Sequence, residues 1–329
     1  MAAALALLAL AVGLVGVDRL RLQLAAVDRG WFGAALLAGG LAQVFSVYRW
    51  ERIARIFGLR SATRALAVAY AQGMTLNVLL PGATLGGDAL RSVRLQALGN
   101  PLGVAALTVL LDRLSGLWVL CVLSLLTGSA LGLDLLLSGG ERAAPLAALL
   151  ARALPGVAPV LGAGGIVLAY LGALALLCAI PWLPLRPANA RPAHGAVAGA
   201  ATRLWQRLGQ LHELAQAQRA PLARSLWSSL AVQLLTALTL WLCARAAGGP
   251  AGYWQVQAVA APVFIAGALP LSYGGFGARE LMALVAFPLA GMSPELGLAA
   301  SALYGIVGVV LGLLAAPAFA LRAPAAPGD

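Results

Sequence analysis

Residues 77–91 read NVLLPGATLGGDALR, and a partial copy of this stretch, PLSYGGFGARE, occupies residues 270–280. Each stretch contains a proline, then a pair of glycines, and then an arginine four residues after the second glycine. Both interrupt sequence that is otherwise almost uncharged and apolar. These two motifs are therefore the first candidates for the functional part of the chain.

The composition indicates a membrane protein. Hydrophobic residues make up 61% of the chain and charged residues only 10%, which is far from the balance of a soluble domain. The net charge of +11 comes from arginine alone, since the sequence has no lysine. The arginines lie in loops between apolar runs and not on one basic face interleaved with aromatic residues, so nucleic acid is not an expected partner. Their position follows the positive-inside rule for cytoplasmic loops.

Metal, disulfide and common nucleophile motifs are missing from the sequence. The cysteines, Cys121, Cys178 and Cys243, lie in separate apolar runs, so no disulfide framework is expected. The histidines, His194 and His212, lie in a polar loop without metal ligands at suitable spacing. Phosphate-binding loops, dinucleotide fingerprints and catalytic triads are not found either. We therefore expect no metal site and no cofactor.

Apolar runs and basic segments predict how the chain crosses the membrane. Two segments rich in arginine, 49–64 and 181–224, should lie on the cytoplasmic side, each with an amphipathic helix in the membrane interface. Residues 1–17 are apolar and carry no basic N-terminal region, which favours a first membrane helix over a cleaved signal. The predicted full spans are residues 1–17, 31–48, 102–133, 160–180, 226–246 and 296–321.

The number of membrane crossings between the two cytoplasmic segments predicts that the two motifs form re-entrant hairpins. An even number of crossings must separate the two cytoplasmic segments, and runs 102–133 and 160–180 already supply two. Residues 65–100 should then enter and leave on one side, and residues 255–290 should do the same from the opposite side. The expected breaks are the prolines and glycine pairs of the motifs, namely Pro81, Gly86, Gly87, Pro270, Gly274 and Gly275.

The expected fold is an all-α polytopic membrane protein in a single domain, residues 1–329, with about six full spans and two re-entrant helical hairpins. The order span, hairpin, span occurs twice, over about residues 31–133 and 226–321, and the two copies should have inverted topology. Inverted repeats are typical of secondary transporters, whose substrate sites lie between the repeats. The alternative is that both motifs are surface loops between ordinary spans.

The chemistry of the motifs fits a phosphate or a lipid headgroup. Glycines let backbone N–H groups approach a ligand, and a helix that begins just afterwards has a partly positive N-terminus. Arg91 and Arg279 would add paired N–H donors for phosphate oxygens. Arg113 is a third candidate for the same role. The alternative for the glycines Gly86, Gly87, Gly274 and Gly275 is close helix packing.

Three acidic residues complete the candidate site, because charges within membrane spans are costly and are usually functional. Asp88 and Glu280 could be counter-ions of the arginines or proton carriers that couple transport. Asp112 could instead neutralise a partner within a packed bundle, as could the neighbouring Arg113. Asn77 precedes the first break and is more typical of a residue that satisfies the backbone than of a ligand.

These residues resemble the integral-membrane "flippase-like" family, which corresponds to the transmembrane half of bacterial lysylphosphatidylglycerol synthetase. The resemblance covers about residues 30–320. It implies a multi-pass protein of the bacterial inner membrane that translocates an anionic or modified lipid between leaflets. The residues that carry it are Asn77, Pro81, Gly86, Gly87, Asp88, Arg91, Asp112, Arg113, Gly116, Pro270, Ser272, Gly274, Gly275, Gly277, Arg279 and Glu280.

In the full synthetase a cytosolic aminoacyl-transfer domain follows the membrane part, whereas this chain stops at Asp329. Only the membrane function is therefore expected to carry over, for an anionic or aminoacylated phospholipid or for a polyprenyl-phosphate-linked sugar. A membrane-embedded enzyme with Asp88 or Glu280 as base, and a non-catalytic scaffold for a lipid- or glycan-modifying enzyme, are the alternatives. The expected partners are lipids with anionic headgroups, with a second copy of the chain or a lipid-modifying enzyme as further candidates.

Overall fold

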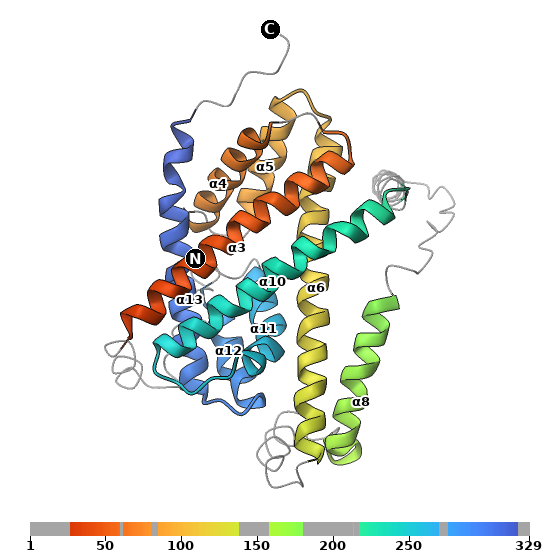
Figure 1. Ribbon diagram of the computed structural model, residues 1–329, viewed down its shortest axis with the longest axis vertical. Coiled ribbons are helices and arrows are strands. Elements are labelled where there is room, and N and C mark those ends of the chain that lie inside the picture. The colour runs from red at the N-terminus through yellow and green to blue at the C-terminus, as the bar shows by residue number, and fades with distance from the viewer. Residues whose placement is uncertain are drawn as a thin grey trace, which may run out of the picture.

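The computed structural model describes residues 27–59, 62–79, 85–137, 158–179, 213, 217–269 and 276–321. Within these ranges the chain forms nine α-helices and one short 3-10 helix (Figure 1). The helices are α3 (Arg29–Ile56), α4 (Thr63–Leu79), α5 (Leu85–Ala97), α6 (Leu102–Leu137), α8 (Ala158–Ala179), α10 (Arg219–Ala246), α11 (Tyr253–Ala268), α12 (Ala278–Leu289), α13 (Pro294–Leu314) and the 3-10 helix η2 (Ala316–Phe319).

Among the described residues, four helices are long and apolar enough to cross a membrane: Arg29–Ile56, Leu102–Asp134, Arg219–Ala246 and Pro294–Phe319. They contain the predicted runs 31–48, 102–133 and 226–246 and most of the run 296–321. The run 160–180 corresponds to α8, and the run 1–17 lies outside the described residues. The all-helical, multi-pass class predicted from the sequence is confirmed, while the number of spans stays a prediction.

The basic segment 49–64 is expected to form a separate interfacial helix, but the structure differs. Its first residues, 49–56, are the last turns of the long helix α3. Trp50 and Ile53 are fully buried there, whereas Arg52 and Arg55 are exposed, so this part of the helix has an inner and an outer face. The helix continues because its inner face packs against the bundle. The helix expected in segment 181–224 lies mostly outside the described residues.

Two halves of the chain share one order of helices. A long helix, two short helices and a second long helix form the first half, α3 to α6, and the same order forms the second half, α10 to α13. Matching helices begin about 190 residues apart. The short pairs, α4 with α5 and α11 with α12, each pack together at the places where the sequence predicts hairpins.

Glycine caps recur at matching positions of the two halves. Gly58 follows α3 with φ 68°, and Gly248 follows α10 with φ 82°. Each donates its N–H to the carbonyl three residues earlier at 3.0 Å. Gly99 and Gly291 have φ values of 84° and 77° and follow α5 and α12. Left-handed backbone of this kind ends many helices and suits glycine, which has no Cβ. The two halves thus end corresponding helices in the same way.

The packing of the helices is also symmetric between the halves. Helix α3 lies antiparallel to α10, and the Asp28 N–H donates to the Ala246 carbonyl at 2.9 Å where α3 begins and α10 ends. Helix α4 packs against α13 just as its counterpart α11 packs against α6. In Figure 1 the pair α4–α5 lies near one end of the bundle and the pair α11–α12 near the other. Each short helix pair thus contacts a long helix of the other half.

Small residues allow the close approach of the two central helices. Ala35, Ala38 and Ala42 are buried on one face of α3, in the manner of helix contacts within membranes. Helix α8 packs against α6. The Trp118 indole N–H of α6 donates to the Leu177 carbonyl of α8 at 3.0 Å. Buried polar groups lie on most of the described helices, and several charged ones meet between α3, α5 and α6.

Candidate functional site

Five ionised residues of the first half form a charged cluster between α3, α5 and α6, composed of Arg49, Asp88, Arg91, Asp112 and Arg113. At its centre, each carboxylate oxygen of Asp112 accepts a bond from a different arginine. Arg49 Nε donates to Oδ1 at 2.7 Å, and Arg91 Nη2 donates to Oδ2 at 2.9 Å. The Asp112 side chain is only 1% exposed, and the two arginines are 5% and 3% exposed. Asp112 is thus the buried counter-ion of two arginines from different helices.

The pair Asp88 and Arg113 forms the outer part of the charged cluster. Arg113 Nε donates to Asp88 Oδ2 at 2.9 Å, and Arg113 Nη2 donates to Oδ1 at 2.8 Å, in a two-pronged ion pair. Arg91 Nη1 is 3.4 Å from the same Oδ1. The Arg113 side chain is 40% exposed and the Asp88 side chain 18%. A ligand that approaches the cluster would therefore meet Arg113 first.

Arg91 lies against two aromatic rings. Its guanidinium carbon lies 4.1 Å from the centre of the Trp50 ring and 4.6 Å from that of Tyr70, within the range of cation–π attraction. With Asp112 and Asp88 also in contact, Arg91 is fixed between α3, α4, α5 and α6. This geometry favours a positioning role for Arg91, and a direct ligand role for Arg113.

The charges of the cluster do not balance. Three guanidinium groups face two carboxylates, which leaves one uncompensated positive charge among the described residues. Two buried guanidinium nitrogens, Arg49 Nη1 and Arg91 Nε, have no hydrogen-bond partner there. Because an unpaired buried charge is costly, the cluster is suited to receive an anion.

The arginine of the second motif lies in a separate, balanced group. Arg279 Nη2 donates to Glu280 Oε1 at 2.9 Å, and Arg279 Nε donates to Ser301 Oγ at 3.1 Å. Ser301 Oγ in turn donates to Glu280 Oε1 at 3.0 Å. Glu280 Oε2 accepts from the Gly277 N–H at 2.6 Å, which caps the start of α12. Within the described part of the chain, no contact joins this group to the charged cluster.

Gly87 of the first motif is a packing residue. A Cβ at Gly87 would clash with the Gly73 carbonyl oxygen and with Asn77 Oδ1. Asn77 Oδ1 accepts a hydrogen bond from the Gly87 N–H at 3.0 Å, so it satisfies the backbone at the start of α5. This geometry favours close helix packing as the role of Gly87 and backbone hydrogen bonding as the role of Asn77. Gly86 lies beside it in the first turn of α5, whereas Pro81, Pro270, Ser272, Gly274 and Gly275 lie outside the described residues.

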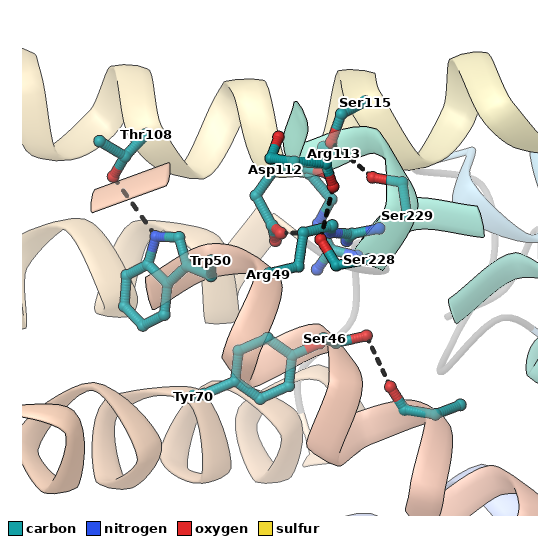
Figure 2. A network of polar contacts seen from close by, with 12 residues as sticks. Ser46, Arg49, Trp50, Tyr70, Thr108, Asp112, Arg113, Ser115, Ser228 and Ser229 are labelled. Carbon is teal, nitrogen blue, oxygen red and sulfur yellow. Dashed lines mark hydrogen bonds and ion pairs between the residues drawn. The ribbon is translucent and has the colours of Figure 1, made fainter. Parts of the chain in front are cut away.

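The sequence pattern does not predict Arg49 as a member of the charged cluster, because the positive-inside rule assigns it to the cytoplasmic segment 49–64. Its position on the buried face of α3 follows the spacing of Ala42, Ser46 and Ile53, which could have identified it. Figure 2 shows it between α3 and α6, directed at Asp112. A Cβ at Gly116 would lie 2.8 Å from Arg49 Nη1, so this glycine leaves room for the guanidinium.

Metal ligands do not converge in the part of the chain that the structure describes, since no group of three His, Cys, Asp or Glu residues could hold an ion there. The chemistry available at the charged cluster is that of arginine donors and aromatic rings. It can bind an anion and shield it from lipid, as described for buried ionised groups in membrane proteins.

The fold and the charged cluster define a multi-pass membrane protein with a buried, cation-rich site. Comparison with family models then places it more closely. Residues 1–316 match the family described as "Lysylphosphatidylglycerol synthase TM region", and the chain belongs to that family. The resemblance drawn from the motifs is thereby confirmed, and the family relates the protein to the modification or translocation of membrane lipids. Comparison with curated proteins gave no match.

Proposed function

We propose that the protein is a lipid translocase, which moves an anionic lipid headgroup between the leaflets of a membrane. The observation that carries this proposal is the uncompensated positive charge of the charged cluster, buried among helices of membrane-spanning length. Such charges are costly in a membrane unless they serve a ligand or a partner. The phosphate of a lipid would supply the missing negative charge while its acyl chains stay in the bilayer.

The relation between the two halves supports translocation over simple binding. Helices α3 and α10 are antiparallel, and the two short helix pairs lie near opposite ends of the bundle. Inverted repeats allow a central site to be exposed alternately to the two sides of a membrane. In this proposal α4–α5 opens the cluster to one side, and α11–α12 closes or opens the path on the other.

The geometry gives less support to a lipid-phosphate enzyme. Such an enzyme would need a carboxylate free to act as a base. Asp88 is bound to Arg113 and Arg91, and Glu280 accepts from Gly277, Arg279 and Ser301. The lone pairs of these carboxylates are therefore already used by donors within the protein. Both residues are better suited to orient the arginines.

A leaflet-exchange assay in proteoliposomes with labelled phosphatidylglycerol tests the translocase. The informative variant is Arg113→Ala, because Arg113 is the most exposed cation of the cluster. Arg52→Ala is the matched control, since Arg52 is exposed on α3 and lies against Tyr48, away from the cluster. We expect wild type and Arg52→Ala to exchange the lipid and Arg113→Ala to exchange it at least about tenfold more slowly, as for loss of a charged contact. Absence of exchange by the folded wild type, for every lipid offered, would favour a scaffold.

A further inference from the structure

Arg49 directs part of its guanidinium group away from the charged cluster. Its Nε is bound to Asp112, but its Nη1 is buried without a partner among the described residues, in a side chain that is 5% exposed. A Cβ at Gly116 would lie 2.8 Å from Arg49 Nη1 and 3.0 Å from Gln233 Nε2. Two N–H donors, one from α3 and one from α10, thus lie close together beside Gly116 of α6.

The surroundings of this point are polar but contain little negative charge. In the view of Figure 2, Ser115, Ser228 and Ser229 lie on the side of Arg49 away from Trp50. Ser229 Oγ donates to Ser115 Oγ at 3.3 Å, and Ser115 Oγ donates to the Asp112 carbonyl at 3.1 Å. The hydroxyl protons are thus used within the protein, while oxygen lone pairs remain available as acceptors. Of the described acidic residues, only Asp112 contacts Arg49, and both its carboxylate oxygens are engaged.

We propose that Arg49 and Gln233, with the hydroxyls of Ser115 and Ser229, form a second subsite of the headgroup site that selects a net anionic, hydroxyl-bearing headgroup and rejects an aminoacylated one. This inference rests on the proposed function and deepens it. Arg49 Nη1, which has no partner among the described residues, and Gln233 Nε2 bind oxygens of a phosphate ester. The serine oxygens accept from hydroxyls such as those of a glycerol headgroup. A free phosphate ion has the same oxygens but lacks those hydroxyls.

Charge explains the selectivity. The cluster with Arg49 carries one uncompensated positive charge among the described residues. A phosphatidylglycerol headgroup has one negative charge and neutralises it. A lysyl ester of the same headgroup has two added amines and is a net cation, so it would increase the buried positive charge. Like charges in a site of low dielectric repel strongly.

Lipid binding to the purified full chain in detergent, followed by native mass spectrometry, tests the subsite without requiring transport. The probes are phosphatidylglycerol, its lysyl ester and inorganic phosphate as a competitor. We expect the wild type to bind phosphatidylglycerol at least about tenfold more tightly than the lysyl ester. Gln233→Glu places a carboxylate beside Arg49 Nη1 and keeps the Arg49–Asp112 pair, so it should abolish this preference. Gln96→Glu, at an exposed position of α5, adds the same charge elsewhere and should retain it.

Three results would overturn the subsite. These are equal binding of the two lipids by the wild type, an unchanged preference in Gln233→Glu, and displacement of the lipid by inorganic phosphate at concentrations similar to that of the lipid. The last result would assign the donors to a free anion. Selective binding without leaflet exchange would leave the subsite intact and contradict only the translocase. Exchange of both lipids at equal rates, together with equal binding, would support the translocase and contradict only the subsite.

Discussion

Asp112 shows how a single residue can hold the charged cluster together. Both of its carboxylate oxygens bind arginines, and it is almost completely buried. Removal of one partner from a buried ion pair leaves a charge without compensation, which typically costs about 3–5 kcal/mol. The outer carboxylate, Asp88, is partly exposed, so water can replace some of its interactions.

The first prediction compares these two carboxylates. Asp112→Asn should lower the free energy of unfolding by about 3–5 kcal/mol, and Asp88→Asn should lower it by less, since Arg113 is 40% exposed. Thermal unfolding of the purified variants in one detergent, monitored by circular dichroism, provides the comparison. Equal stability of Asp112→Asn and the wild type would show that Asp112 does not neutralise Arg49 and Arg91.

The residues of the charged cluster could be predicted from sequence only in part. Asp88, Arg91, Asp112 and Arg113 were recognised because charges in apolar runs are costly. Arg49 was not, because the positive-inside rule treats the arginines of a segment alike and does not say which of them faces the bundle. The convergence of these residues also depends on which helices pack together, which spacing along one helix does not reveal.

Helix α11 shows how two elements depend on one another. It contains Pro262, and a hydroxyl of α6 bonds its backbone just before this proline. Ser124 Oγ donates to the Gln257 carbonyl at 2.8 Å and accepts from the Ala261 N–H at 3.0 Å. Proline removes a backbone donor from a helix, and neighbouring side chains often satisfy the groups that are left. The contact therefore joins the second hairpin to a helix of the first half.

A serine pair on α6 provides the second prediction. Ser124→Ala removes both bonds to the backbone of α11 and should destabilise the protein by about 1–3 kcal/mol. Ser129→Ala is the matched control, because the buried Ser129 hydroxyl has no partner among the described residues, so its removal should be neutral or slightly stabilising. Unfolding midpoints of both variants in the same detergent are the measurement. The link between α6 and α11 would be refuted if the two variants were equally stable.

The elements themselves were largely predictable. The repeated motifs and apolar runs predicted long helices at both ends of each half and a break between two short helices. The extent of α3 was not predicted, since its last turns carry exposed arginines that read as an interfacial segment. Its buried face, with Trp50 and Ile53, continues the helix through that segment. Tertiary packing thus overrode the charge pattern, as it often does.

The described helices fall into two halves with the same order of elements. Helix α3 runs antiparallel to α10, each short helix pair contacts a long helix of the other half, and glycine caps recur at matching positions. The charged cluster belongs to the first half, whereas the corresponding group of the second half is balanced. In the proposed site, the first half supplies the charged cluster, and the second half contributes Gln233 and Ser229 of α10.

Alternate exposure of that site requires the two ends of the bundle to face opposite sides of a membrane, and the translocase depends on this claim. Cysteine labelling in sealed vesicles of known orientation tests it most directly. Cys121, Cys178 and Cys243 are first replaced by alanine, and a single cysteine is then placed at Gln96 or at Pro250, both of which are exposed.

The account predicts that an impermeant maleimide added outside labels only one of these two positions, Gln96→Cys in inside-out vesicles and Pro250→Cys in right-side-out vesicles. Permeabilisation should make both positions reactive, which controls for accessibility. Labelling of both positions from the same side in sealed vesicles would contradict the reversed arrangement of the halves, and with it the alternate exposure of the charged cluster.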